Sequence, residues 1–224
     1  MQLISLKTGF LALTLTAFAS VTACSTSSQN QAQNPNTADT GGMPGMDHGS
    51  GMNHNMAMDL GPADADYELR FLDAMTPHHQ GAVEMAKEAI TKSKRPEIKK
   101  LSQNIINAQN IEINQMKQWR KAWYPKAGNK PMAYDATMGH MMPMSQQQMQ
   151  GMMMKGDLGA ADAQFDLRFV NAMIPHHEGA LTMAQDALKK TKRPEIKKMA
   201  QEIIASQQKE IDQMKQWRQA WYKQ

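Results

Sequence analysis

The 224-residue chain has a single cysteine, Cys24, few aromatic residues and no excess of charge of one sign. One cysteine excludes an internal disulfide framework, a cysteine-based zinc site and a Cys-x-x-Cys redox motif. Lysine and arginine (25) nearly balance aspartate and glutamate (21), and the two signs are interspersed, so the charge does not favour nucleic acid as a partner. Methionine is abundant instead. The chain has 22 methionines against 5 phenylalanines, far more than a core needs to fill gaps.

Residues 1–23 are predicted to be an export signal. Their apolar stretch, which ends at Ala19, is too short to span a bilayer. It leads into Val-Thr-Ala-Cys ending at Cys24, which resembles a lipobox. We therefore expect Cys24 to be lipidated and to anchor the mature protein to a membrane of the cell envelope, in the periplasm; an ordinary signal peptide cut nearby is the alternative. Residues 24–60 lack hydrophobic periodicity and are predicted to form a flexible, disordered tether.

Residues 61–124 and 159–222 are two copies of one unit. They align without a gap, and 40 of the 64 aligned positions are identical, which indicates an internal duplication. Each copy is typical of two helices with apolar residues at helical spacing; in the first copy we expect them at 64–91 and 96–123. Because a lone helical hairpin buries too little apolar surface, the two copies predict one all-α domain, a four-helix bundle with internal pseudo-symmetry.

The connection between the two hairpins, residues 125–158, is rich in Pro, Gly, Gln and Met. It is far longer than the usual loop between helices, and loops of that length are usually functional or disordered. No strand pattern competes with the helical one. The domain 61–224 is therefore expected to consist of hairpin 61–124, a Met-rich connector without regular structure, and hairpin 159–224.

A short motif of methionine and histidine recurs in the first helix of each copy. Met75 is followed three and four residues later by His78 and His79, so both imidazoles neighbour the thioether on the helix surface. Met85 lies two turns beyond His78 on the same face, and small residues such as Gly81 are expected to leave that face unobstructed. The second copy repeats the four ligand-type residues at Met173, His176, His177 and Met183.

The second helix of each copy places a carboxylate and a thioether on one face. Gln109, Glu112 and Met116 are spaced i, i+3 and i+7. A glutamate on an apolar face needs a partner, and the facing histidines provide one. The same residue types recur in the second copy at Gln207, Glu210 and Met214.

Two interpretations of this pattern remain open. The methionines could be ordinary core residues, with the histidines forming a buried polar network. Recurrence of the whole motif favours metal binding, because thioether and imidazole together suit Cu(I) or Ag(I), and imidazole also suits Cu(II). A di-iron site would need several inward glutamates and Glu-x-x-His motifs, and the chain contains no Glu-x-x-His.

Methionine and histidine also gather outside the predicted helices. Packing cannot explain methionines in segments that have no core, and the interleaved histidines favour metal capture over an adhesive surface or an oxidation buffer. Thioethers need no deprotonation and form no disulfides in an oxidising compartment. The candidate ligands in the tether are Met43, Met46, His48, Met52, His54 and Met56, and those in the connector are Met138, His140, Met141 and Met144.

The repeated pattern Arg-Phe-x-x-x-Met-x-Pro-His-His-x-Gly-Ala-x-x-Met-Ala, followed by Pro-Glu-Ile, Gln-x-x-Glu-Ile and Met-Lys-Gln-Trp, resembles a bacterial domain-of-unknown-function family, DUF305. Within that family it resembles the CopM-type periplasmic copper-binding proteins, over essentially all of 61–224. The resemblance implies a ferritin-like four-helix bundle, copper and silver binding by Met/His sites, and a role in copper resistance. It carries over Met75, His78, His79, Met85 and Met116, with Met173, His176, His177, Met183 and Met214, as ligands.

The sequence thus predicts an envelope protein that binds copper and is not an enzyme, since no nucleophile–base pair is present. It would sequester Cu(I) or Cu(II), or deliver it to an envelope copper chaperone or exporter, and accept Ag(I) as a surrogate. The alternative is an interaction or scaffold bundle without metal, whose methionines scavenge oxidants.

Overall fold

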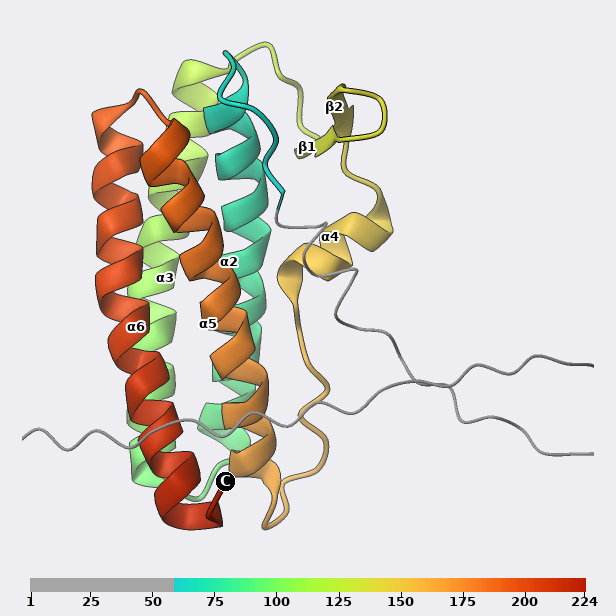
Figure 1. Cartoon of the computed structure of the whole chain (residues 1–224). Helices are drawn as coiled ribbons and strands as arrows, with labels where there is room; N and C mark the ends of the chain where they lie inside the picture. Colours follow the sequence, from blue (N-terminus) through green and yellow to red (C-terminus); the bar gives the residue numbers. More distant parts are fainter. Residues whose placement is uncertain (1–58) are drawn as a thin grey trace, which may run out of the picture. The chain divides into compact units, whose positions relative to one another are not determined.

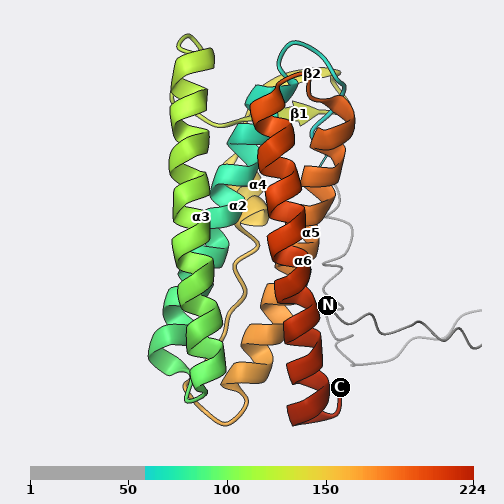
Figure 2. The same cartoon turned by 90° about the vertical axis from the view of Figure 1, so that its left-hand side faces the viewer.

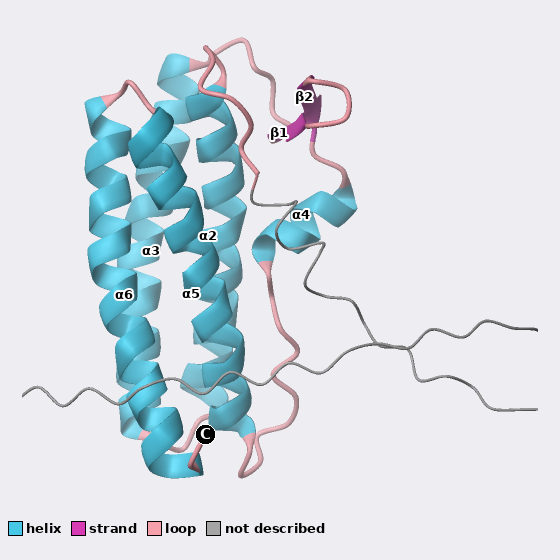
Figure 3. Ribbon diagram, in the orientation of Figure 1, coloured by secondary structure: helices cyan, strands magenta, loops and turns pink. Residues whose placement is uncertain are grey.

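Two long helical hairpins dominate the computed structural model, which describes residues 59–224 (Figures 1 and 3). The first hairpin is α2 (Tyr67–Lys92) and α3 (Pro96–Trp123). The second is α5 (Phe165–Lys190) and α6 (Pro194–Tyr222). Between them come β1 (Met132–Asp135), β2 (His140–Pro143) and the short helix α4 (Gln146–Met153).

The two hairpins pack into a four-helix bundle in which α2 and α5 run antiparallel (Figures 1 and 2). Lys92, the last residue of α2, donates to the Gly159 carbonyl just before α5, at 2.7 Å. At the other end, Lys190 of α5 donates to the Gly61 carbonyl just before α2, at 2.8 Å. The predicted all-α, ferritin-like bundle of two duplicated hairpins is confirmed, and all described residues belong to one compact unit.

Helix boundaries follow local chemistry, with one correction to the sequence-based prediction. Helix α3 begins at Pro96 as predicted, since proline fits the first helical position and needs no backbone donor there. Helix α2 begins at Tyr67 rather than at residue 64. The Asp64 carboxylate accepts a hydrogen bond from the backbone N–H of Asp66, at 3.0 Å, and this local turn competes with helix.

The prediction that the connector lacks regular structure is wrong. Its strands β1 and β2 form an antiparallel hairpin in which Asp135 pairs with His140. Helix α4 begins with a capping box, in which the Ser145 and Gln148 side chains each bond the other residue's backbone N–H. These elements are shorter than the windows over which periodicity is readable. The strands and α4 lie beside α2, on the side away from α6 (Figure 1).

A partly buried ion pair fixes the connector to the bundle. The Asp73 carboxylate of α2 pairs with the Arg120 guanidinium of α3 and accepts from the backbone N–H of Met132 in β1, at 2.9 Å. The same guanidinium donates to the carbonyls of Gly128 and Lys130, at 2.8 and 3.1 Å. One side-chain pair therefore holds both ends of the first hairpin and the start of the connector.

Aromatic residues lie at the C-terminal ends of α3 and α6. Trp119 and Trp123 stack at 5.2 Å between ring centroids, and the Arg193 guanidinium lies 4.0 Å from the Trp123 ring centroid. None of the helices in the described part of the chain is both long and apolar enough to cross a membrane. The predicted leader, Cys24 and the ligands at 43–56 lie outside the described residues.

Candidate metal site

The four histidines of the repeated motif lie together in the middle of the bundle. His78 of α2 and His176 of α5 face each other across the two hairpins, with ring centroids 3.9 Å apart. His79 and His177 lie 6.5 and 6.2 Å from their neighbours along the chain. All four are at most 1% exposed. The antiparallel contact of α2 with α5 thus joins two motifs that are 98 residues apart into one histidine cluster.

Two of the imidazoles have a carboxylate partner from the second helix of their own hairpin, as the sequence predicted. His79 Nε2 lies 2.7 Å from Glu112 Oε2, and His177 Nε2 lies 2.8 Å from Glu210 Oε2. The ring nitrogen donates and the carboxylate accepts. Metal-ligating histidines usually donate their other ring N–H to such an acceptor, which fixes the tautomer and leaves the opposite nitrogen with its lone pair.

Each imidazole keeps an unpartnered, buried Nδ1. This holds for His78, His79, His176 and His177, and His78 Nε2 lacks a partner as well. A buried polar atom without a hydrogen bond is costly, so such atoms in a native protein call for an explanation. A soft metal ion that accepts these nitrogen lone pairs would satisfy them. Imidazole nitrogen with nearby thioether sulfur therefore fits Cu(I), Ag(I) or Cu(II).

The six methionines of the repeated ligand pattern are fully buried, at 0% exposure, and each core cluster contains some from both hairpins. Met75 and Met116 of the first hairpin share a core cluster with Met183 of the second. The other cluster contains Met85, Met173 and Met214. Met75 and Met85 are ten residues apart, about 15 Å along the helix, so they cannot ligate one ion, and each cluster combines methionines of both hairpins.

The face of α2 that Gly81 was expected to leave open is covered by the connector. The Met153 carbonyl, at the end of α4, accepts from His176 Nε2 at 3.1 Å. A Cβ atom at Gly81 would overlap that carbonyl oxygen and lie 2.8 Å from its carbon. Sequence reasoning missed this contact because a main-chain carbonyl leaves no signature in side-chain spacing. Its only signal was a glycine inside an otherwise regular helix.

The connector ligands are spread over both faces of a small hairpin. His140 is exposed, and its Nδ1 lies 3.1 Å from the Met141 carbonyl. Met138 in the turn is 63% exposed, whereas Met144 packs against the bundle core. Among residues 59–224, no group of three His, Cys, Asp or Glu side chains could hold a metal ion. A metal site within residues 59–224 therefore needs methionine sulfur among its ligands.

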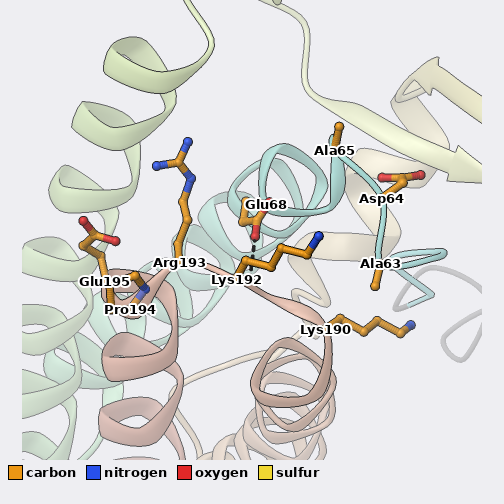
Figure 4. A pocket seen from close by; sticks show the side chains of 9 residues that line it. All are labelled: Ala63, Asp64, Ala65, Glu68, Lys190, Lys192, Arg193, Pro194 and Glu195. Carbon is orange, nitrogen blue, oxygen red and sulfur yellow. Dashed lines mark hydrogen bonds between the residues drawn. The ribbon is translucent and has the colours of Figure 1, made fainter.

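A surface hollow of about 580 Å³ lies at one end of the bundle, away from the histidines (Figure 4). Glu68 in this hollow accepts from the backbone N–H of Lys192, at 3.0 Å. Its other charged residues are Asp64, Lys190, Arg193 and Glu195. Neither methionine nor histidine lines it, so it does not fit a soft metal ion.

Burial keeps the central histidines neutral. Burial, together with the nearby His177 and His79, lowers the pKa of His176 to about 3. Burial, with His176 next in importance, also lowers the pKa of His78 well below its ordinary value of 6.5. Neutral imidazole is the form that binds metal, so both rings stay competent as ligands in mildly acidic surroundings.

This burial predicts acid destabilisation of the metal-free protein. Both folded-state pKa values are depressed, so the unfolded chain takes up protons first, below about pH 6.5. We expect no loss of stability from these groups above pH 7. Below about pH 6.5 the free energy of unfolding should fall by about 1.4 kcal/mol per pH unit for each ring. Urea unfolding between pH 7.5 and 5 measures it, with His78→Gln/His176→Gln as control. Equal pH slopes in the two proteins would contradict the assignment.

Comparison with known proteins gives the family of the chain. The family described as "Domain of unknown function (DUF305)" matches residues 14–120 and 68–218. The solved structure of CopM in its Cu(II)-bound form is 44% identical, with a TM-score of 0.56, and the match covers 69% of this chain and 97% of CopM. CopM has also been solved in Cu(I)-bound and Ag-bound forms, each 39% identical to this chain.

Two further relatives are more distant or shorter. A DUF305 fragment from Deinococcus radiodurans is 26% identical, with a TM-score of 0.51, over 69% of this chain and 95% of the fragment. The uncharacterized protein L153 of Acanthamoeba polyphaga mimivirus is 49% identical over 49 residues, which are 22% of this chain and 32% of the viral protein. With its family match over most of the chain and its identity to CopM, this protein belongs to the DUF305 family.

Proposed function

We propose that this protein binds copper in the cell envelope, holding Cu(I) or Cu(II), and Ag(I) as a surrogate, through its methionine and histidine side chains. It acts as a binding protein rather than an enzyme, and sequestering or handing on copper contributes to copper resistance. The observation that carries the proposal is the central cluster of four buried imidazoles, each with an unpartnered Nδ1, in a bundle that also buries six thioethers of the same repeated pattern.

The similarity to CopM supports this choice of metal. CopM has been solved with Cu(I), Cu(II) and Ag bound, and those three ions are the ones that a mixed thioether and imidazole set suits. The carboxylates of Glu112 and Glu210 behind His79 and His177 match the outer partners that metal-bound histidines usually have. In this proposal the export signal and a lipid anchor at Cys24, both expected from the sequence, hold the protein at an envelope membrane in the periplasm, where an envelope copper chaperone or exporter receives the ion.

Burial weakens the alternative of a scaffold whose methionines scavenge oxidants. The six methionines of the repeated ligand pattern are fully buried, out of reach of a dissolved oxidant, because oxidation follows exposure. Met138 and Met142, at 63% and 37% exposed, remain accessible. Within residues 59–224, scavenging is therefore a function for the connector, and it leaves the histidine cluster unexplained.

A competition titration tests the proposal. Purified full-length protein is titrated with Cu(I) against a chromogenic chelator, and compared with the variant His79→Gln/His177→Gln. Glutamine keeps an N–H donor for Glu112 and Glu210 but has no imidazole, so the bundle should fold. We expect the variant to lose at least tenfold in affinity at the tightest site, since each ring removed is a ligand. Unchanged affinity in the variant would reject the histidine cluster as a copper site.

A further inference from the structure

The pseudo-symmetric halves of the histidine cluster differ at one contact. His176 Nε2 donates to the Met153 carbonyl, at 3.1 Å, because a carbonyl oxygen only accepts. His78, its counterpart in the first hairpin, has no partner on either ring nitrogen. The difference arises because a duplicated hairpin has only one connector, so only one of the two rings receives its carbonyl.

The carbonyl reaches the ring only because residue 81 is glycine. Its missing side chain leaves the space that the Met153 main chain occupies, and a Cβ atom there would lie 2.8 Å from the Met153 carbonyl carbon. Real Cβ atoms do not approach backbone carbon so closely, so any side chain would push the end of α4 away. Glycine in a helix interior also costs up to about 1 kcal/mol of folding stability relative to alanine. The packing of the Met153 main chain against Gly81 offsets that cost.

Helix α4 is held in this position at two further points. The neighbouring residue Met152 is 3% exposed and inserts into the core cluster of Met75 and Met183. Lys155, just after the helix, pairs with Glu84 of α2 at 3.1 Å. The contact with His176 is thus part of a docked element rather than the end of a loop.

We propose that α4 is a working part of the copper site: the Met153 carbonyl orients His176, and Gly81 is the positioning residue that lets it do so. The carbonyl holds the proton on Nε2 and leaves the lone pair on the buried Nδ1, which makes His176 the better ordered ligand of the central pair. The effect on metal binding rests on the copper-binding function proposed above. The effect on the imidazole N–H is a property of the metal-free protein.

The variant Gly81→Ala tests this inference in the full-length protein. In the metal-free state, we expect the His176 imidazole N–H resonance in ¹H–¹⁵N spectra to shift upfield and to exchange faster with water. In an Ag(I) titration followed by the same resonances, we expect affinity at the central pair to fall about 10- to 100-fold, the usual loss for an outer hydrogen-bond partner of a ligating histidine.

Two further variants separate position from packing. Gly151→Ala adds a methyl group in open space and favours helix, so it should preserve both. Gly151→Pro breaks α4 while leaving the sequence of the four bundle helices unchanged, and it should reproduce the losses of Gly81→Ala. It tests the inference if Gly81→Ala does not fold.

The outcomes distinguish this inference from the proposed function. If the wild type binds Ag(I) at the pair and both Gly81→Ala and Gly151→Pro retain that affinity and the unshifted resonance, α4 has no role and the inference fails alone. If the wild type shows no Ag(I)-dependent change at any of the four histidines, the copper function fails and the inference with it.

Discussion

Replacing Met75, Met116 and Met183 together by leucine is expected to remove much of the metal-induced stabilisation of the bundle while leaving the metal-free protein nearly as stable. Leucine and methionine have similar volumes, and such exchanges usually cost less than about 1.5 kcal/mol each, but leucine has no sulfur. An ion at a thousandfold excess over its Kd stabilises a folded protein by about 4 kcal/mol. In a chain of this size that corresponds to a rise in Tm on the order of 10 °C.

Thermal unfolding with and without Ag(I) measures the effect. The matched control is Met199→Leu: Met199 lies in the same core cluster, but its counterpart in the first hairpin is Leu101, so the position needs volume and not sulfur. We expect the control to keep the full Ag(I)-dependent rise in Tm. If the triple variant keeps it too, the bundle methionines only fill space, and the ordinary-core interpretation stands.

Arg120→Ala is expected to cost about 3–5 kcal/mol of folding stability. Its partner Asp73 is 2% exposed at the side chain, and removal of one member of a buried ion pair leaves an uncompensated charge. Burial already raises the pKa of Asp73, against the lowering effect of Arg120. The substitution also removes two donors to the connector, at Gly128 and Lys130, so the connector should become accessible to protease. Urea unfolding and limited proteolysis are the measurements.

The second hairpin supplies the control for this experiment. Arg218 occupies the equivalent place and donates to the amide oxygen of Asn171, at 3.2 Å, in an exposed pair. Arg218→Ala should therefore change stability by about 0.5 kcal/mol or less, as is usual at the surface. Equal losses in the two variants would mean that the ion pair with Asp73 does not hold the connector.

The duplication made most of the bundle predictable. Matching apolar stripes required the two hairpins to pack, Pro96 marked the start of a helix, and Glu112 could be paired with a histidine because a carboxylate on an apolar face needs a partner. Each of these inferences uses local spacing or the chemistry of one side chain. Local information of this kind was sufficient for the helices and for two of the hydrogen bonds in the site.

The grouping of the ligands was not predictable in the same way. Spacing within α2 put Met75 and Met85 on one face, but only the antiparallel packing of α2 on α5 determines which methionine of the other hairpin joins each cluster. The β-hairpin and α4 were missed because their tertiary contacts, such as that of Met132 with Asp73, stabilise segments too short to show a period.

Each methionine-containing core cluster combines residues of both hairpins, and this has a consequence for how such a protein could arise. A chain with one hairpin could complete neither thioether cluster by itself, since each draws a residue from the opposite half. It would need a second copy related by a two-fold axis, and both copies of the paired imidazole would then be chemically identical. Fusion of the two copies lifts that constraint. In the fused chain a single connector joins the end of the first hairpin to the start of the second. His78 and His176 can therefore have different hydrogen-bond partners, which a symmetric homodimer forbids.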